Sequence, residues 1–340
     1  MVAWPCAERR GDEVSKGTVF VTGGAGYIGS HACKALARAG WDPVVYDNLS
    51  RGHREAVRWG RLEVGDLLDG ERLRGAMERC RPDAVLHFAA FAYVGESVSA
   101  PGMYWRNNVA GSLSLLEAMR DLGVRRLVFS STCATYGNPL ETPITESHPQ
   151  RPVNPYGETK LAVERMIDGF RLAHGMSSVA LRYFNAAGCD REGEIGEEHD
   201  PEPHLLPRAL MAAAGRVDAL EIYGGDWDTR DGTCVRDYIH VEDLAAAHLK
   251  ALEALERGDA PAACNLGNGR GFTVREVLDS VERVVGRPVP SRVVARRPGD
   301  PAELVGGAEL ARTALGWTPA VRELDEMVES AWAWMRRRGA

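Results

Sequence analysis

Short apolar runs alternate with stretches of helical periodicity along the first half of the chain. The runs predict six strands, at residues 18–22, 43–47, 61–66, 84–90, 126–132 and 178–185. Between them, apolar residues recur at helical spacing at 31–39, 71–80, 107–122 and 161–170. Because strands that alternate with helices usually pair in parallel, the pattern predicts an α/β fold with a doubly wound parallel sheet covered on both faces.

The pattern changes after residue 185. Residues 186–203 are rich in Gly, Glu and Pro and predict long loops. Later elements are a helix after 204–207, a strand at 220–224, a helix at 241–256, a strand at 264–267 and a closing helix at 323–338. We expect the main sheet, built from 17–185, to receive 234–267 as well. The rest of 186–340 then forms a smaller, interleaved α/β lobe, and the polar residues 1–16 a flexible extension.

Composition narrows the class of protein. The 340 residues are 44% hydrophobic and 26% charged, which is ordinary for a globular protein, and the net charge of −7 argues against a nucleic-acid or anionic-membrane surface. No apolar run approaches the roughly 20 residues of a membrane span, and the first ten residues lack the apolar core of a signal peptide. Seven scattered cysteines without CxxC spacing favour reduced thiols in a cytoplasmic protein. No metal-ligand cluster is evident.

A glycine-rich turn follows the first strand. Residues 23–29 read Gly-Gly-Ala-Gly-Tyr-Ile-Gly and lead into a helix, so backbone N–H groups and a helix N-terminus can meet a pyrophosphate. A glycine pattern alone is weak evidence, but the second strand ends in Asp47, close to the expected distance from the glycines. A carboxylate there accepts hydrogen bonds from ribose hydroxyls and repels a 2′-phosphate. Asp47 therefore favours NAD over NADP, although an acid in this place is also an ordinary turn residue.

A tyrosine and a lysine stand one helical turn apart in the fourth predicted helix. Pro155 fits the first turn of this helix, which places Tyr156 and Lys160 on the same face. A free tyrosine has a pKa of about 10, so a base near neutral pH requires a drop of roughly 3 units, or about 4 kcal/mol. A neighbouring cation can supply part of that drop. The pair is common by chance, but Ser-Ser-Thr at 130–132 puts hydroxyls at a strand end, where chemistry gathers in doubly wound sheets.

The glycine turn, Asp47, the hydroxyl-bearing strand end and the Tyr156/Lys160 pair, in this order, resemble the extended short-chain dehydrogenase/reductase superfamily. More narrowly, the chain is similar to the UDP-glucose 4-epimerase family. The matching stretches cover nearly all of the chain from about residue 17, at 21–31, 46–49, 94–97, 107–109, 129–137, 155–157, 181–185, 231–240 and 297–300. The resemblance implies an isomerase with a Rossmann-type NAD-binding domain and a UDP-sugar-binding C-terminal lobe. It also implies a homodimer that interconverts UDP-glucose and UDP-galactose through a transient 4-keto intermediate.

The resemblance assigns roles to individual residues. Tyr156 would accept the proton of the sugar 4-hydroxyl, Lys160 would lower the tyrosine pKa and bind the nicotinamide ribose, and Thr132 would bind the same 4-oxygen. Besides Tyr156 and Lys160, the implied NAD contacts are Gly23, Gly26, Tyr27, Ile28, Gly29, Asp47, Asn48, Asp66, Leu67, Phe88, Ala89, Ala90, Asn107, Ser130 and Phe184. Besides Thr132 and Tyr156, the implied substrate contacts are Asn185, His204, Leu205, Tyr223, Arg236, Tyr238, Arg297, Asp300 and Leu304. Guanidinium groups such as those of Arg236 and Arg297 also suit a pyrophosphate on physical grounds.

The chain departs from the family pattern at four positions. Thr132 stands where well-known relatives have serine, which keeps the hydroxyl. Ala92 replaces a lysine near the cofactor, so one charged contact to NAD is missing. His204 replaces a common asparagine near the nucleotide. Leu304 occupies the position that limits the 2-substituent of the sugar, where relatives vary from tyrosine to serine or cysteine.

Three other functions are known on related folds. A nucleotide-sugar 4,6-dehydratase needs an Asp-Glu pair after the strand-end threonine, and here Cys133 and Ala134 follow it, which excludes that chemistry. A non-catalytic NAD- or nucleotide-sugar-binding protein would have lost Tyr156 or Lys160, and both are present. A UDP-xylose/UDP-arabinose 4-epimerase, or an enzyme for both hexose and pentose, stays open. Residues 88–94 and 131–135 resemble that branch at least as well, and a missing hydroxymethyl group separates substrates weakly.

Overall fold

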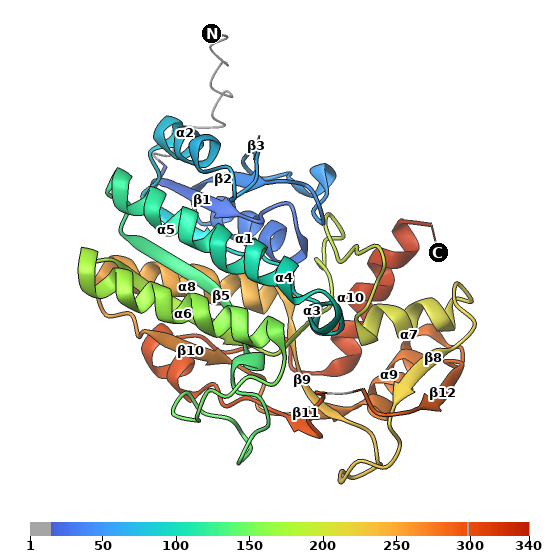
Figure 1. Ribbon diagram of the computed structural model, residues 1–340. Helices are drawn as coiled ribbons and strands as arrows, with labels where there is room; N and C mark the ends of the chain where they lie inside the picture. Colours follow the sequence, from blue (N-terminus) through green and yellow to red (C-terminus); the bar gives the residue numbers. More distant parts are fainter. Residues whose placement is uncertain (1–14, 298, 340) are drawn as a thin grey trace.

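The computed structural model describes residues 15–297 and 299–339, so nearly all of the expected N-terminal extension lies outside the described residues (Figure 1). Seven strands form one sheet in the order β10-β6-β5-β4-β1-β2-β3, and every pair in it is parallel. Their bounds are β1 Thr18–Thr22, β2 Asp42–Asp47, β3 Arg61–Val64, β4 Ala84–His87, β5 Arg126–Thr132, β6 Ser177–Tyr183 and β10 Ala263–Leu266. Successive strands are added on one side of β1 up to β3 and on its other side from β4 onward. In sheets of this kind, a crevice opens at the carboxyl ends of the two strands where the order reverses, here β1 and β4.

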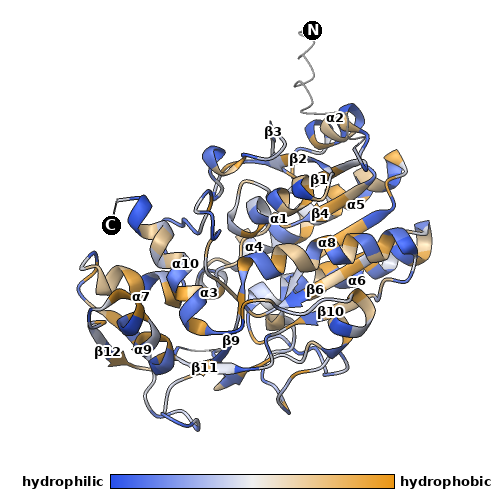
Figure 2. Cartoon of the chain, turned by 180° about the vertical axis from the view of Figure 1, so that it is seen from behind, coloured by the Kyte–Doolittle hydropathy of each residue, from blue (hydrophilic) through white to orange (hydrophobic). Residues whose placement is uncertain are grey.

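Helices cover both faces of this sheet, as the strand–helix alternation predicts. On one face lie α1 (Tyr27–Arg38) and α8 (Val241–Arg257); on the other lie α2 (Gly70–Cys80), α5 (Gly111–Leu122) and α6 (Pro155–His174). Alternate residues of β1 serve the two layers, since Val19 and Val21 join the first core and Phe20 the second. The strands are coloured mainly as hydrophobic in Figure 2, and the helices carry hydrophilic residues along part of their surface. The predicted doubly wound α/β fold is confirmed.

A smaller lobe with its own core lies at the lower right of Figure 1. Its strands are β7 (Asn185–Ala187), β8 (Leu220–Tyr223), β9 (Val235–His240), β11 (Gly271–Thr273), β12 (Ser291–Val294) and β13 (Glu303–Leu304). Its helices are α7 (Leu205–Ala213), α9 (Val274–Val285) and α10 (Leu324–Arg337). Strand β9 pairs with β7, β11 and β13, and β8 pairs with β12.

The segment 234–267, expected to contribute to the main sheet, divides between the two lobes. Only α8 and β10 return to the main sheet, where β10 pairs with β6. Strand β9 stays in the second sheet because its Tyr238 packs into the core of that lobe, while Ile239 reaches the core under α8.

The remaining helical segments are short. Short helices α3 (Val94–Ser99) and α4 (Pro101–Tyr104) lead through a π-helical turn η2 (Trp105–Ala110) into α5. Single turns η1 (Arg54–Ala56) and η3 (Cys133–Thr135) follow β2 and β5, and a further π-helical turn η4 (Ala311–Leu315) precedes α10. Within the described part of the chain, no helix is both long and apolar enough to cross a membrane.

Candidate active site

The glycine turn between β1 and α1 packs too tightly for side chains. Gly23 has φ +72°, and a Cβ there would lie 2.6 Å from the backbone nitrogen of Ala89. A Cβ at Gly29 would lie 2.2 Å from the carbonyl oxygen of Gly23. Helix α1 begins at Tyr27, earlier than predicted, with Gly26 as an N-cap that offers no side-chain hydrogen bond. The first amides of α1 are therefore not capped by a side chain and can serve an anion at the carboxyl end of β1.

Asp47 sits beside this turn at the end of β2. Its carboxylate is buried and accepts hydrogen bonds from the backbone nitrogens of Ala25 at 3.0 Å and Leu49 at 2.8 Å. Burial raises the pKa of Asp47, and the two N–H donors act in the opposite direction. Next to it, Asn48 donates to Asp66 at 2.8 Å after β3. The acid predicted for the ribose thus lies beside the glycine turn, and the ends of adjacent strands β1, β2 and β3 bring these residues to one edge of the sheet.

Other predicted cofactor residues lie around the same crevice. Phe88, directly after β4, packs its ring 4.5 Å from the ring of His248 on α8. The side chain of Leu67 is buried, and that of Asn107 donates to the side-chain oxygen of Asn108 at 2.9 Å. Asn108 was not singled out by sequence reasoning. It accepts from the Phe91 nitrogen at 2.8 Å and donates to Thr159 on α6 at 3.1 Å, so it ties the loop after β4 to the catalytic helix.

Helix α6 starts where the sequence predicts. The side chain of Asn154 accepts a hydrogen bond from the Gly157 nitrogen at 2.9 Å, and Pro155 occupies the first turn. Tyr156 and Lys160 are both buried, and the Lys160 Nζ lies 6.0 Å from the Tyr156 ring centre. Capping thus fixes the start of α6 and turns both residues toward the end of β5.

Lys160 reaches across to β5. Its Nζ donates to the carbonyl oxygen of Ser130 at 2.8 Å and lies 4.9 Å from the ring centre of Phe129. Ser130 is itself hydrogen-bonded to the hydroxyl of Tyr183 on β6. The ammonium is therefore held by one carbonyl, which leaves two of its three donors for a ligand.

Burial dominates the electrostatics of the pair. It raises the pKa of Tyr156 well above its usual value, Tyr183 adds to this, and the Thr132 hydroxyl lowers it. It lowers the pKa of Lys160 to about 7, against an opposing effect of Glu164. The expected lowering of the tyrosine pKa by Lys160 is outweighed in the protein alone, because burial disfavours the charged phenolate more than the neighbouring groups favour it. A phenolate at Tyr156 requires charge or hydrogen bonds beyond those of the chain.

A buried ion pair lies between α6 and β6, next to Ser131 of β5, and the sequence analysis did not predict it. Glu164, one turn after Lys160, pairs with Arg182 of β6 at 2.6 Å and accepts a hydrogen bond from Ser131. Arg182 also donates to the hydroxyl of Tyr136 at 2.9 Å. The available signal was an acid four residues after a buried lysine, on the face that the helix turns to the sheet.

The residues predicted for the nucleotide part of a substrate gather from separate segments. The Arg297 guanidinium lies 4.2 Å from the ring centre of Tyr223, at the end of β8. Arg236 on β9 and Arg297 each lie 3.9 Å from a different oxygen of Asp300. Two guanidinium groups beside one carboxylate leave net positive charge for an anion.

The remaining predicted substrate residues divide between cleft and core. Leu304 packs against a buried cluster of Cys133, Tyr136, Ile144 and Phe184, next to the Thr132 end of β5. Tyr238 is buried in the core of the smaller lobe, 6.4 Å from Phe272 between ring centres. Asn185 donates to the carbonyl oxygen of Asp237 at 2.9 Å, and Leu205 is the first residue of α7. His204 precedes Leu205 and contacts the side chains of Glu197 and Glu202.

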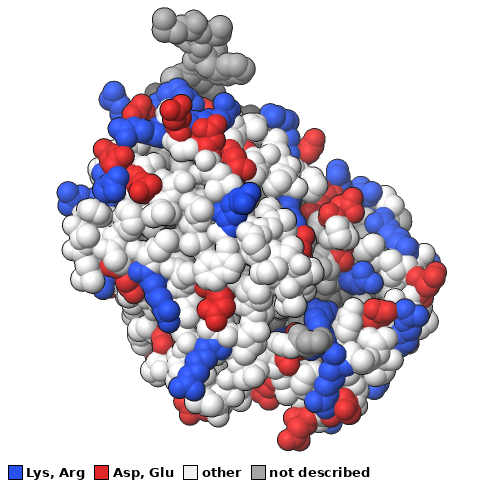
Figure 3. All heavy atoms as spheres, viewed as in Figure 1, with Lys and Arg blue, Asp and Glu red and all other residues white. Residues whose placement is uncertain are grey.

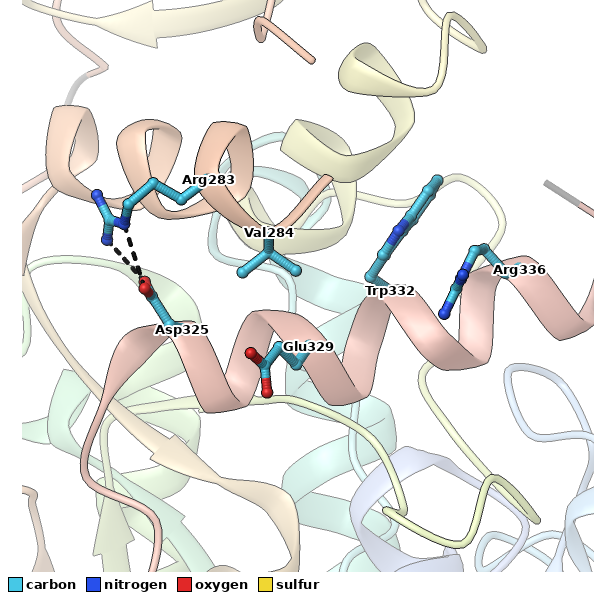
Figure 4. A pocket seen from close by; sticks show the side chains of 6 residues that line it. All are labelled: Arg283, Val284, Asp325, Glu329, Trp332 and Arg336. Atoms are coloured by element: carbon cyan, nitrogen blue, oxygen red, sulfur yellow. Dashed lines mark hydrogen bonds and ion pairs between the residues drawn. The ribbon is translucent and has the colours of Figure 1, made fainter. Parts of the chain in front are cut away.

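The surface has two hollows, of which one adjoins the glycine turn. One of about 290 Å³ is lined by Gly26 and Tyr27 of the glycine turn together with residues 193–196. Another of about 390 Å³ lies between α9 and α10, where Figure 4 shows Arg283 and Asp325 facing each other across one end of it. The lining residues of this second hollow are Arg283, Val284, Asp325, Glu329, Trp332 and Arg336. None of them belongs to the predicted site, whereas the first hollow includes Gly26 and Tyr27 of that site.

Comparison with known proteins identifies relatives over nearly the whole chain. The profile of the NAD-dependent epimerase/dehydratase family matches residues 19–267. The chain is 53% identical to a UDP-glucose 4-epimerase of Rhizobium meliloti over 94% of this chain and 97% of the relative. It is 54% identical to the crystal structure of UDP-glucose 4-epimerase from Brucella ovis in complex with NAD, with a TM-score of 0.91 and coverage of 93% and 97%. A structure from Stenotrophomonas maltophila with bound NAD and formylated UDP-arabinopyranose is 39% identical, with a TM-score of 0.91 and coverage of 95% and 100%.

Proposed function

The chain belongs to the NAD-dependent epimerase/dehydratase family, and from that premise we propose that it interconverts UDP-glucose and UDP-galactose by inverting C4 through a transient 4-keto sugar. The observation that carries the proposal is the buried Tyr156/Lys160 pair held against the end of β5. Proton transfer at a sugar hydroxyl needs an acid–base group that is shielded from water, and this pair stands where strand ends meet.

The residues of the crevice fit NAD. The glycine turn leaves no room for a Cβ, the start of α1 has no side-chain cap, and Asp47 presents a carboxylate beside both. These features suit a pyrophosphate and an unphosphorylated ribose. When bound, NAD supplies the hydride acceptor and donor for C4.

The chain's own groups handle the proton and the position of the sugar. Tyr156 takes the proton of the 4-hydroxyl and returns it, Thr132 hydrogen-bonds the same oxygen, and the Lys160 ammonium uses its free donors to orient the reacting groups. Arg236 and Arg297 hold the pyrophosphate of the UDP-sugar. The sugar then lies beside Leu304 and Phe184, at the Thr132 end of β5.

The proposal is tested by turnover of the purified protein on UDP-glucose, UDP-galactose, UDP-xylose and UDP-arabinose, with no NAD added. We expect fast interconversion of the hexoses and NAD released on denaturation, because a cycle that returns its hydride gains nothing by releasing the cofactor. The pentose arm is included because a structural neighbour holds a UDP-arabinopyranose derivative. Protein that is isolated without NAD and works only with added NADP would refute both the retention and the Asp47 argument.

Replacing Leu304 with serine is expected to widen the sugar pocket. Leu304 is larger than serine and packs against Phe184 and Cys133, and a well-packed site cannot accept the extra atoms of a 2-acetamido group without strain. The native enzyme should therefore turn over UDP-N-acetylglucosamine poorly, and Leu304→Ser should raise that activity with little change for UDP-galactose. The ratio of kcat/KM for the two sugars measures this. Equal treatment of both sugars by the native enzyme would place Leu304 away from the 2-position.

We also propose that the protein is a cytoplasmic homodimer. Support comes from exposed apolar side chains on the face formed by α3–α5, namely Val98, Met103, Trp105 and Leu113. The same face shows a broad area with few charged residues in Figure 3. Six cysteines in the described residues are free, which suits a reducing compartment. Sedimentation as a monomer at micromolar concentration would contradict the dimer.

A further inference from the structure

A cluster of two imidazoles and two carboxylates lies in the loop between β7 and α7. The His204 Nδ1 is 2.9 Å from a carboxylate oxygen of Glu197 and 2.8 Å from one of Glu202. The His199 Nδ1 is 3.3 Å from an oxygen of each of the same two acids. One ligand atom from each residue lies within 4.8 Å of the other three. Both histidines thus turn the same ring nitrogen toward the same two carboxylates.

Among the described residues, no lysine or arginine forms an ion pair with either of the two carboxylates. The side chains of Glu197 and Glu202 are only 6% and 8% exposed, and their ion-pair partners among the described residues are the two imidazoles. A second acidic cluster nearby, Asp190, Glu192 and Glu194, has the Lys34 ammonium at its centre, 2.6–3.0 Å from each acid. With neutral imidazoles the first cluster has a charge of −2, which two protons or one divalent cation would neutralise.

The donor set and its dimensions fit a metal. Tetrahedral zinc with bonds of about 2.0–2.2 Å places its ligands roughly 3.3–3.6 Å apart. The observed nitrogen–oxygen distances of 2.8–3.3 Å need to open by a few tenths of an ångström. Two imidazoles favour zinc or a similar transition metal over magnesium or calcium, which prefer oxygen ligands alone. We propose that Glu197, His199, Glu202 and His204 form a binding site for a divalent transition-metal ion, with zinc as the best fit.

Sequence analysis predicts no such cluster because the spacing Glu-x-His-x-x-Glu-x-His matches no common ligand motif. The four side chains meet only because the loop folds back on itself ahead of α7. Four protein ligands close the coordination shell, so the ion has a structural rather than a catalytic role.

The surroundings indicate what the ion holds together. The Tyr93 ring centre lies 5.8 Å from the ring centres of both His199 and His204. Tyr27 of the glycine turn lies 6.3 Å from His199 and donates to the carbonyl oxygen of Gly188 at the start of the same loop. A metal here fixes the loop between the glycine turn and the N-terminus of α7, where the two lobes meet.

The test is zinc binding by protein that has been freed of metal with a chelator and keeps its NAD. We expect one zinc per chain by calorimetry and elemental analysis, a higher midpoint of thermal unfolding, and the strong visible absorption of tetrahedral cobalt on substitution with Co²⁺. His199→Gln and Glu202→Gln should each weaken zinc binding on the order of 100-fold or more. His174→Gln, an exposed histidine on α6, and Glu192→Gln in the lysine-filled cluster are the matched controls and should bind zinc as the native chain does.

A variant that keeps a ligand separates binding from folding. His199→Cys should still bind zinc and should add a sulfur-to-cobalt charge-transfer band in the Co²⁺ form. The proposal is overturned if the native chain and the His199→Gln/Glu202→Gln double variant bind zinc with the same affinity. If both bind weakly, the cluster is neutralised by protons. If both bind tightly, with circular dichroism unchanged, the zinc does not depend on these ligands.

Discussion

Replacing Tyr156 with phenylalanine is expected to lower kcat by at least about 10²-fold, and up to about 10⁴-fold, with NAD still bound. The hydroxyl is the proposed acceptor of the 4-hydroxyl proton, and Tyr156 is buried, so bulk water does not readily take over that role. Phenylalanine keeps the ring packed against the pocket and removes a single oxygen. The measurement is the rate of UDP-galactose conversion, together with the NAD content of the denatured variant.

Tyr183→Phe is the matched control for Tyr156→Phe. It also removes a tyrosine hydroxyl from the same region, one that is hydrogen-bonded to Ser130 and is assigned no proton transfer. We expect it to lower kcat by less than about 10-fold, as the loss of one neutral hydrogen bond of about 1 kcal/mol implies. Near-native turnover of Tyr156→Phe, or equal losses in the two variants, would refute the assignment of Tyr156 as the acid–base group.

Replacing Arg182 with methionine is expected to lower the free energy of unfolding by about 3–5 kcal/mol. Arg182 and Glu164 are 9% and 8% exposed and lie 2.6 Å apart, so the substitution leaves a buried carboxylate without its cation. The remaining donors to Glu164, Ser131 and Gln150, are neutral and cannot replace that charge. Urea unfolding at pH 7 measures the difference.

Two comparisons make the Arg182 prediction specific. Arg74→Met breaks the exposed pairs of Arg74 with Glu78 on α2 and with Asp121 on α5 and should cost at most about 1 kcal/mol. The double variant Arg182→Met/Glu164→Leu removes both buried charges and should recover most of the lost stability. A cost below about 1 kcal/mol for Arg182→Met would contradict the prediction, because the Glu164 carboxylate would then not remain buried and uncompensated.

The parts of the site that rest on local chemistry were predictable from sequence. The glycine turn, Asp47 after β2 and the position of Tyr156 and Lys160 on one face of α6 follow from backbone sterics, strand ends and helical period. The alternation of strand and helix determined the parallel sheet in the same way. Residues such as Arg236 and Arg297 were named only through the family resemblance, because no spacing rule joins β9 to a loop some sixty residues later.

Tertiary structure alone decided how charges are buried and which distant groups meet. It decided that the pKa of Tyr156 is raised, since the dominant cause is burial of the hydroxyl and not the charge of Lys160 one turn away. It joined Glu164 to Arg182, sent β9 to the second sheet, and folded the loop at 197–204 so that four ligand groups converge. Sequence determines what is favourable within a few residues, whereas burial and long-range pairing depend on how whole elements pack.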